Sequence, residues 1–187
     1  MIEKWWPENS AIPEAVLDRE KIILQRIDEA RGRIRFNLGC GVAHAPGFIN
    51  IDVAESCQPD VVWDVQKSIP FPDRCATEIQ SRDFLEHVHP EALAQVMREC
   101  HRVLKIGGIC VHEVPGAPNA IAFQDPTHRT FFTSQTPFYW MQGHSSRRWE
   151  KYGQSYGYVP FRLVRAEALK EKKTGKPTGW IRMKFYK

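Results

Sequence analysis

The 187-residue chain has no long hydrophobic run and no paired-cysteine motif. No stretch approaches the roughly 20 apolar residues of a membrane-spanning helix, and the N-terminus, which starts Met1-Ile2-Glu3-Lys4, lacks the apolar core of a signal peptide. The five cysteines are odd in number and scattered, without a C-x-x-C. These absences predict reduced thiols, no membrane partner and a cytoplasmic location, and they argue against a disulfide framework.

The composition is that of an ordinary globular protein with an uneven charge. Hydrophobic residues make up 42% and charged residues 26% of the chain, which is enough for a sizeable core at this length. The net charge is +4, and residues 162–187 hold nine Lys or Arg against two Glu. We expect a solvated terminal hairpin there, with a patch facing phosphates or an anionic substrate as the alternative.

The most informative segment is a glycine turn between two short apolar stretches. Residues 34–38 predict a buried strand, Asn37-Leu38-Gly39-Cys40-Gly41 a turn, and residues 48–53 a second strand with Asp52 near its end. Glycine lets a ligand approach the backbone because no Cβ blocks it. An acidic residue at the end of the next strand is placed to accept hydrogen bonds from ribose hydroxyls. The pattern predicts a cofactor that contains a nucleoside.

The third glycine of a dinucleotide-binding G-x-G-x-x-G is missing. His44 stands in its place, and only residues 42–47 separate the turn from the second strand. Pro46 and Gly47 make a long helix there improbable, so a pyrophosphate would lose the helix N-terminus that normally holds it. S-adenosylmethionine has no phosphate and does not need that helix. We therefore expect S-adenosylmethionine, with a first crossover helix that is short or missing.

Further motifs follow in a consistent order: NLGCG (37–41), NIDV (50–53), VVWDV (61–65), SIPFPD (68–73), FLEHV (84–88) and RVLKIGGICVHEVP (102–115). With them the chain resembles the class I S-adenosylmethionine-dependent methyltransferases, and most closely the small type 11 methyltransferase domains. The resemblance covers about residues 34–140. It implies an α/β, Rossmann-like fold with a mostly parallel seven-stranded sheet that ends in a C-terminal antiparallel hairpin.

The element pattern fits this organisation. Residues 1–33 form an arm and a helix (13–30), and residues 34–187 the methyltransferase domain, within one globular unit. Further strands are expected at 61–64, 77–81, 109–114, 161–164 and 180–186, and a helix at 90–104 that Gly107-Gly108 stops. Residues 115–160 lack a long periodic element and are rich in Pro, Gly and aromatic residues, which is typical of a substrate lid.

The resemblance also assigns cofactor-binding residues. Asp64 is expected to receive the adenine amino group and the backbone amide of Val65 to meet the ring, although Asp64 also suits a turn cap. Arg82 or Asp83 is expected beside the sulfonium and its methyl group. The full predicted cofactor set is Asn37, Gly39, Cys40, Gly41, Asp52, Asp64, Val65, Arg82 and Asp83. Cys40 is interpreted as a small buried residue and not as a nucleophile.

Three residues are candidates for proton transfer. His87, within FLEHV, is either a general base or, with Glu86, a structural brace. Asp125 and His128 lie in a D-P-T-H segment after the fifth strand, where they either take a proton from an acceptor or form a turn through backbone bonds. No metal is expected: there is no H-E-x-x-H, and the adjacent His112 and Glu113 point to opposite faces of a strand.

The predicted function is therefore transfer of a methyl group from S-adenosylmethionine to oxygen or nitrogen of a small-molecule or glycan-like acceptor. A nucleic-acid methyltransferase is a less favoured alternative, because no N-P-P-Y or D-P-P-Y follows the fourth strand and no Pro-Cys pair occurs. A non-catalytic module that serves a partner is a third alternative. The sequence leaves the oligomeric state open.

Overall fold

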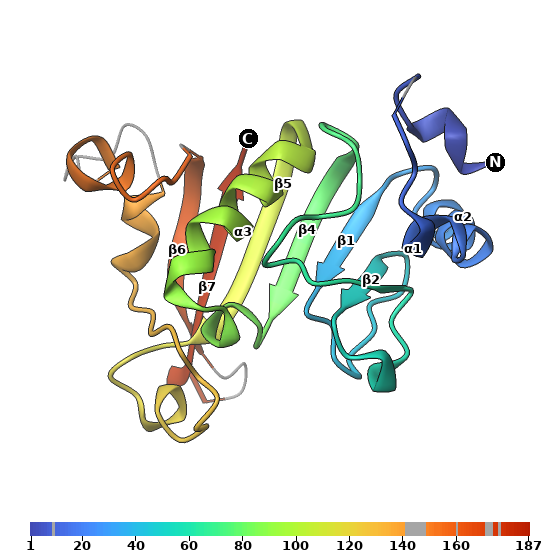
Figure 1. The fold of residues 1–187 in the computed structure, drawn as a ribbon. Coiled ribbons are helices and arrows are strands. Elements are labelled where there is room, and N and C mark those ends of the chain that lie inside the picture. Colours follow the sequence, from blue (N-terminus) through green and yellow to red (C-terminus); the bar gives the residue numbers. More distant parts are fainter. Residues whose placement is uncertain (9, 141–148, 160, 171–173, 176) are drawn as a thin grey trace.

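A seven-stranded sheet is the centre of the computed structural model, which describes residues 1–8, 10–140, 149–159, 161–170, 174–175 and 177–187 (Figure 1). The strand order is β3-β2-β1-β4-β5-β7-β6. All pairs from β3 across to β5 are parallel, and β7 is antiparallel to both neighbours. The predicted mostly parallel sheet with a C-terminal antiparallel hairpin is confirmed. The strands are β1 (Arg35–Leu38), β2 (Ile49–Asp52), β3 (Val61–Val62), β4 (Ala76–Arg82), β5 (Leu104–Pro115), β6 (Arg162–Lys170) and β7 (Pro177–Tyr186).

One face of the sheet carries the core. Phe36, Ile79, Cys110 and Phe185 are register partners on successive strands, and all four are fully buried. Helix α3 (Pro90–Val103) lies in front of this face, across β5 and β7 in Figure 1. It buries one side at helical spacing: Leu93, Val96, Met97, Cys100 and Val103. This shared apolar contact fixes the register of β4, β5 and β7.

The opposite face of β4, β5 and β7 is polar and half-exposed. Glu78 and Gln80 on β4, and Glu113 on β5, alternate with the buried residues of their strands. Glu78 accepts from Nε of Arg35 at 2.9 Å, and Glu113 is paired with Arg182. Paired charges occupy the face that a helical layer covers in most parallel sheets.

The predicted N-terminal helix (13–30) is divided in two. Helix α1 (Glu14–Leu17) follows Pro13, and α2 (Glu20–Glu29) begins after Arg19, whose backbone is not helical. The chain leaves α2 through Arg31 and Gly32, both with positive φ, and the Gly32 amide donates to Ile27 O at 2.8 Å. This bond closes the helix end as expected for a glycine C-terminal cap.

The prediction that Gly107-Gly108 stop the preceding helix was wrong. Helix α3 ends at Val103, and β5 begins directly at Leu104 and runs through both glycines. A Cβ on Gly108 would lie 2.8 Å from Lys105 O, and Gly107 has a φ of +79°. The glycines therefore serve a bend at the start of the strand, beside the register shift at Ala76/Glu78.

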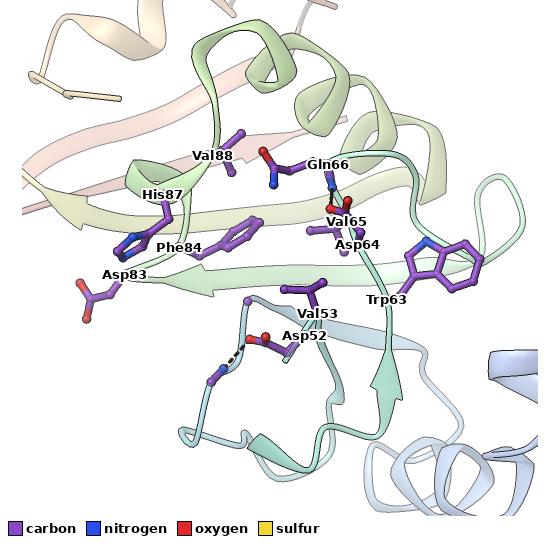
Figure 2. Close-up of a pocket in the computed structure, with 12 residues that line it drawn as sticks. Asp52, Val53, Trp63, Asp64, Val65, Gln66, Asp83, Phe84, His87 and Val88 are labelled. Atoms are coloured by element: carbon purple, nitrogen blue, oxygen red, sulfur yellow. Dashed lines mark hydrogen bonds between the residues drawn. The ribbon is translucent and has the colours of Figure 1, made fainter. Parts of the chain in front are cut away.

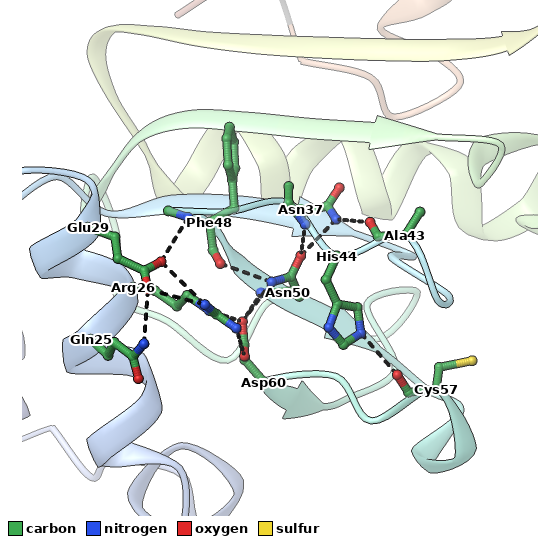
Figure 3. Close-up of polar contacts among 12 residues, drawn as sticks. Gln25, Arg26, Glu29, Asn37, Ala43, His44, Phe48, Asn50, Cys57 and Asp60 are labelled. Carbon is green, nitrogen blue, oxygen red and sulfur yellow. Dashed lines mark hydrogen bonds and ion pairs between the residues drawn. The ribbon is translucent and has the colours of Figure 1, made fainter.

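The first crossover contains only turns, which confirms the expected missing helix. Buried Asn50 on β2 replaces it as the organiser of residues 42–47 (Figure 3). Its Oδ1 accepts from the Ala45 amide at 2.8 Å and from Asn37 Nδ2 at 2.9 Å. Asn37 also donates to Ala43 O, and His44 Nε2 lies 3.0 Å from Cys57 O. Side-chain bonds thus hold the segment that helical bonds would otherwise hold.

Asp60 fastens the same region to the N-terminal helix. Its carboxylate is 1% exposed and accepts from the Asn50 amide and side chain, each at 2.8 Å. Arg26 on α2 donates to it through Nε and Nη2, and Glu29 accepts from the Gly47 amide (Figure 3). The bidentate ion pair therefore joins α2 to the strand behind the glycine turn.

The predicted lid (115–160) holds only short helical turns in its described part: Ala120–Ala122, Thr136–Tyr139 and Trp149–Gly153. An isolated bridge joins Gly116 to Phe132. Residues 141–148 and 160 of the predicted lid lie outside the described residues. In the described ranges, none of the helices has the length and apolar character that crossing a bilayer requires.

Candidate active site

A pocket of about 370 Å³ opens where β1, β2, β3 and β4 end (Figure 2). The strand order reverses at β1: β2 and β3 lie on one side of it, and β4 and β5 lie on the other. Such a switch point at the carboxyl ends of parallel strands is where open α/β sheets bind ligands. The volume lies in the range of small-molecule sites. The lining residues are Gly39, Gly41, Asp52, Val53, Trp63, Asp64, Val65, Gln66, Asp83, Phe84, His87 and Val88.

The two glycines of the turn serve different purposes. Both have positive φ, +59° at Gly39 and +49° at Gly41. A Cβ on Gly39 would lie only 2.1 Å from the ring of Phe84, whereas a Cβ on Gly41 would meet nothing within 4 Å. Gly39 is therefore required by the packing of Phe84, and the backbone that a ligand can approach freely is that of Gly41.

Asp52 stands at the end of β2 beside this turn. Its Oδ2 accepts from the Gly41 amide and its Oδ1 from the Ala54 amide, both at 2.8 Å. Each carboxylate oxygen has a second lone pair. The carboxylate is thus fixed in position and retains the capacity to accept from two further donors, such as vicinal hydroxyls.

Asp64 follows β3 on the far side of the pocket. Its Oδ1 accepts from the Gln66 amide at 3.0 Å, so it caps a turn, and Oδ2 lies 3.6 Å from Lys67 Nζ. Val65 is buried, and Trp63 donates through Nε1 to Ser68 O at 3.1 Å. This end of the pocket combines apolar walls with a carboxylate, which suits a heteroaromatic ring bearing an amino group.

Of the remaining predicted cofactor residues, only Asp83 lines the pocket. Asp83 accepts from Trp180 Nε1 at 2.5 Å. The side chain of Arg82 is 69% exposed and lies near Asp83 and Glu113, outside the lining set. Asn37 and Cys40 are buried behind the turn and also do not line the pocket. Burial, with the nearby Asp52 charge, raises the pKa of the Cys40 thiol to about 12.

Two motifs that are 40 residues apart in sequence form one unit beside the pocket. The backbone oxygen of Glu86 accepts from the amides of Arg129 at 2.7 Å and Thr130 at 3.0 Å. Thr130 Oγ1 donates to Val88 O at 2.9 Å. Residues 125–130, called the D-P-T-H segment from here on, are thereby held on the 84–88 turn, and the rings of His87 and His128 lie 4.9 Å apart, edge to face.

Hydrogen bonds indicate which ring nitrogen carries the hydrogen in the neutral form of each histidine. Thr127 Oγ1 donates its single hydrogen to Asp125 Oδ1 at 2.7 Å, so His87 Nδ1, 3.0 Å from the same oxygen, is the donor. His128 Nδ1 lies 2.9 Å from Ala122 O, a group that only accepts. In the neutral rings, Nε2 of each histidine therefore carries the lone pair. Hydrogen bonds from the Thr127 hydroxyl and amide lower the pKa of Asp125. The bond from the Thr127 amide to Asp125 Oδ1 also forms the turn that the sequence suggested.

The Glu86 side chain does not act as the brace that the sequence suggested. It is 1% exposed, and neither carboxylate oxygen has a hydrogen-bond partner among the described residues. Desolvation raises its pKa to about 7, and the nearby negative charges of Asp83 and Asp125 add to the effect. A buried acceptor without a partner is costly and unusual in a folded protein.

A second cluster lies inside the core, away from the pocket. His112 Nδ1 is 2.7 Å from Ser81 Oγ and its Nε2 is 3.0 Å from Cys110 Sγ, with Cys100 adjacent. Cys100, Cys110 and His112 are fully buried between α3 and β5. Hydrogen bonds from Cys110 and His112 lower the pKa of the Cys100 thiol below its ordinary value. The cluster satisfies its own polar groups and fastens the helix to the sheet.

Several pocket residues were not foreseen from sequence. The pocket residues that were not predicted are Val53, Trp63, Gln66, Phe84 and Val88. All except Gln66 lie in motifs that were recognised, and all five lie at or shortly after the ends of β2, β3 and β4. Their position at the carboxyl end of a parallel strand was the available signal.

Comparisons with known proteins agree with this geometry. Residues 37–112 match the family model described as a methyltransferase domain. The comparison with curated sequences gave no match. The match spans β1 to β5 and so includes most of the strands that form the pocket, and the similar solved structures show that the chain has the fold of the class I S-adenosylmethionine-dependent methyltransferases.

Solved structures are similar over almost the whole chain. A SAM-dependent methyltransferase from Archaeoglobus fulgidus is 18% identical, with 100% of this chain and 97% of that chain covered and a TM-score of 0.60. A mutant 16S rRNA (adenine(1408)-N(1))-methyltransferase with cosubstrate SAM from Catenulisporales acidiphilia is 13% identical, with 89% of each covered and a TM-score of 0.55. 1,6-Didemethyltoxoflavin-N1-methyltransferase from Burkholderia thailandensis, with bound 1,6-didemethyltoxoflavin and S-adenosylhomocysteine, is 15% identical, with 93% of this chain and 78% of that chain covered and a TM-score of 0.50.

Proposed function

We propose that this methyltransferase transfers a methyl group to oxygen or nitrogen of a small-molecule or glycan-like acceptor. The observation that carries the proposal is that the 84–88 turn lines the 370 Å³ pocket with Phe84, His87 and Val88 and is hydrogen-bonded to the D-P-T-H segment. One end presents Asp52 and Asp64, and the other presents His87. A cofactor and a compact acceptor would therefore meet within a single concave site.

The pocket residues fit S-adenosylmethionine. Asp52 would accept from the ribose hydroxyls, Asp64 and the Val65 amide would bind adenine, and the backbone at Gly41 leaves room for close approach. When bound, the cofactor supplies a methyl group activated by positive sulfur. The protein's main task is then to align the acceptor and exclude water.

His87 is the candidate base within this site. Its lone-pair nitrogen would take the proton of a hydroxyl or amine acceptor, with Thr127 and Asp125 as positioning residues behind its other nitrogen. His128 lies against His87 and would contact the acceptor. The exposed, stacked rings of Phe123 and Phe131, 4.8 Å apart, are proposed to form a wall for the acceptor.

Calorimetric titration with S-adenosylmethionine and S-adenosylhomocysteine tests the cofactor assignment. We expect binding in the wild type and a loss of at least tenfold in Asp52→Ala. The matched control is Glu55→Ala, which removes an exposed carboxylate three residues later. Binding that is equally strong in Asp52→Ala would contradict the assignment of the ribose. Turnover over a panel of hydroxyl and amine acceptors then tests the acceptor class.

RNA is the second candidate acceptor. One similar structure is an rRNA methyltransferase, and residues 162–187 hold nine Lys or Arg. Binding to an oligonucleotide that weakens steeply with salt would favour it. Cofactor binding without turnover of any acceptor would instead favour a non-catalytic module that serves a partner.

A further inference from the structure

Glu86, His87 and His128 bring three potential metal ligands together at the edge of the pocket. One carboxylate oxygen and one ring nitrogen of each histidine lie within 4.8 Å of one another. Glu86 is buried, and both histidines are partly exposed. His87 also lines the pocket, so the cluster is reachable from solvent. We propose that these residues form a binding site for a divalent first-row transition metal such as Zn²⁺ or Mn²⁺.

The unpartnered carboxylate is the first independent reason. Both oxygens of Glu86 are buried without a hydrogen-bond partner among the described residues. Carboxylates of Asp83 and Asp125 are near enough to act on it electrostatically. A cation bound between Glu86 and the histidines would give the buried oxygens a partner and offset the concentrated negative charge.

The outer hydrogen bonds of the two histidines are the second reason. In metal-binding histidines, the ring N–H that does not face the metal commonly donates a hydrogen bond to a backbone carbonyl, a carboxylate or water. His128 Nδ1 donates to Ala122 O, and His87 Nδ1 donates to Thr127, which in turn donates to Asp125. Both Nε2 atoms are therefore left as lone-pair donors, the form that a metal requires.

The set of ligands indicates the type of metal. Two imidazoles and one carboxylate suit Zn²⁺, Mn²⁺ or Fe²⁺ better than Mg²⁺ or Ca²⁺, which prefer oxygen alone. Three protein ligands leave coordination positions for water or an acceptor. This differs from the sequence expectation of no metal, which weighed His112, Glu113, Asp125 and His128 and did not consider Glu86 or His87.

The second cluster of donors is a weaker candidate. Cys100, Cys110 and His112 are fully buried, and both nitrogens of His112 already have partners within the core. A metal site needs an entry path as well as ligands. The Glu86 cluster has one through the pocket.

Metal binding does not rest on the proposed function, but its consequence for the acceptor does. With a metal bound, His87 is a ligand and no longer a base. A hydroxyl of the acceptor on an open coordination position would lose its proton more readily because the metal withdraws charge. Activity removed by a chelator and restored by metal, with unchanged affinity for S-adenosylhomocysteine, would identify this role.

Titration of chelator-treated protein with Zn²⁺ and with Co²⁺ tests the site, using calorimetry and the visible absorption of Co²⁺. We expect one equivalent to bind, with an absorption spectrum of nitrogen and oxygen ligands. Glu86→Gln and His128→Asn should each weaken binding by at least tenfold. The matched control His44→Asn, an exposed histidine on another loop, should leave binding unchanged.

Thr127→Val supplies a milder variant that keeps all three ligands. It removes the hydroxyl that orients His87 and should weaken binding less than Glu86→Gln does. Absence of binding to the folded wild type would overturn the proposal. Equal affinity in Glu86→Gln and His128→Asn, or a thiolate charge-transfer band from the cysteine cluster, would also overturn it. Loss of cofactor binding in Asp52→Ala is measured separately, so the two proposals fail independently.

Discussion

At the scale of residues, Gly39 and Gly41 differ in the space that a side chain would have at each position. Gly39→Ala should destabilise the protein by about 2–4 kcal/mol, because the new Cβ meets the Phe84 ring in addition to the strain of a positive φ. Gly41→Ala should cost only the backbone strain, about 1–2 kcal/mol. Urea unfolding of both variants measures the difference.

A double-mutant cycle with Phe84→Ala isolates the clash. The cost of Gly39→Ala should fall toward that of Gly41→Ala when the ring is absent. Equal costs of Gly39→Ala in the presence and absence of the ring would show that Phe84 is not the cause.

Glu86 should make the stability of the metal-free protein depend on pH. Its folded pKa of about 7 lies above the ordinary value of 4.5, so its favourable contribution is complete below about pH 4.5 and lost as pH rises through 7. Glu86→Gln removes this loss. The melting temperature of Glu86→Gln minus that of the wild type should increase by about 5 °C from pH 5 to pH 8. This corresponds to a change of about 2–3 kcal/mol in their difference in unfolding free energy.

Thermal melts in a chelating buffer measure this shift. Glu91→Gln, an exposed glutamate at the start of α3, is the control and should show the same difference at both pH values. A pH-independent difference for Glu86→Gln would mean that burial does not disfavour its carboxylate.

At the scale of elements, the crossover between β1 and β2 depends on side chains. Asp60→Ala should cost about 3–5 kcal/mol because it leaves Arg26 and the Asn50 amides without their partner. It should also weaken cofactor binding, since Asn50 organises the loop after the glycine turn. Denaturant unfolding and calorimetry check both effects.

Asp28→Ala is the matched control, an exposed carboxylate on the same helix as Arg26. It should change the free energy of unfolding by less than about 0.5 kcal/mol. Similar costs for Asp28→Ala and Asp60→Ala would show that the brace contributes nothing.

Sequence periodicity predicted the strands whose two faces differ in burial. β4 and β7 alternate and were located within a few residues, and the α3 pattern was recognised because its apolar positions share one side. The start of β5 was missed because glycine commonly ends a helix, whereas here Leu104 already pairs with Ala76 on β4 and continues the chain as a strand. Local sequence preference contains no information about this pairing with β4.

The site was predictable where backbone and motif coincide. Gly41, Asp52 and Asp64 lie in the pocket because they follow parallel strands. The roles assigned to them, and to Arg82 and Asp83, stay predictions. The contact between Glu86 and the D-P-T-H segment was not predictable, because it is made by backbone amides 43 and 44 residues away that no pattern marks.

At the scale of the whole molecule, cysteine burial predicts one reactive thiol. Cys40, Cys75, Cys100 and Cys110 are buried, and Cys57 is partly exposed. Burial raises the pKa of Cys75 to about 12, as it does for Cys40, so neither forms the reactive thiolate at neutral pH. A thiol reagent at pH 7.5 should label one cysteine quickly in the native protein and all five in urea.

Mass spectrometry of the labelled peptides identifies the site, and Cys57→Ser should abolish the fast phase. Fast labelling at Cys100 or Cys110 would show that the core between α3 and β5 opens readily.

The clamp between the 84–88 turn and the D-P-T-H segment has a thermodynamic consequence. Phe84, His87 and Val88 face the cofactor pocket, while the amides bonded to Glu86 belong to the segment on the acceptor side. When one ligand has ordered the turn, the other ligand binds without a second loss of conformational entropy there. The cofactor would therefore increase acceptor affinity, and the acceptor would increase cofactor affinity by the same factor.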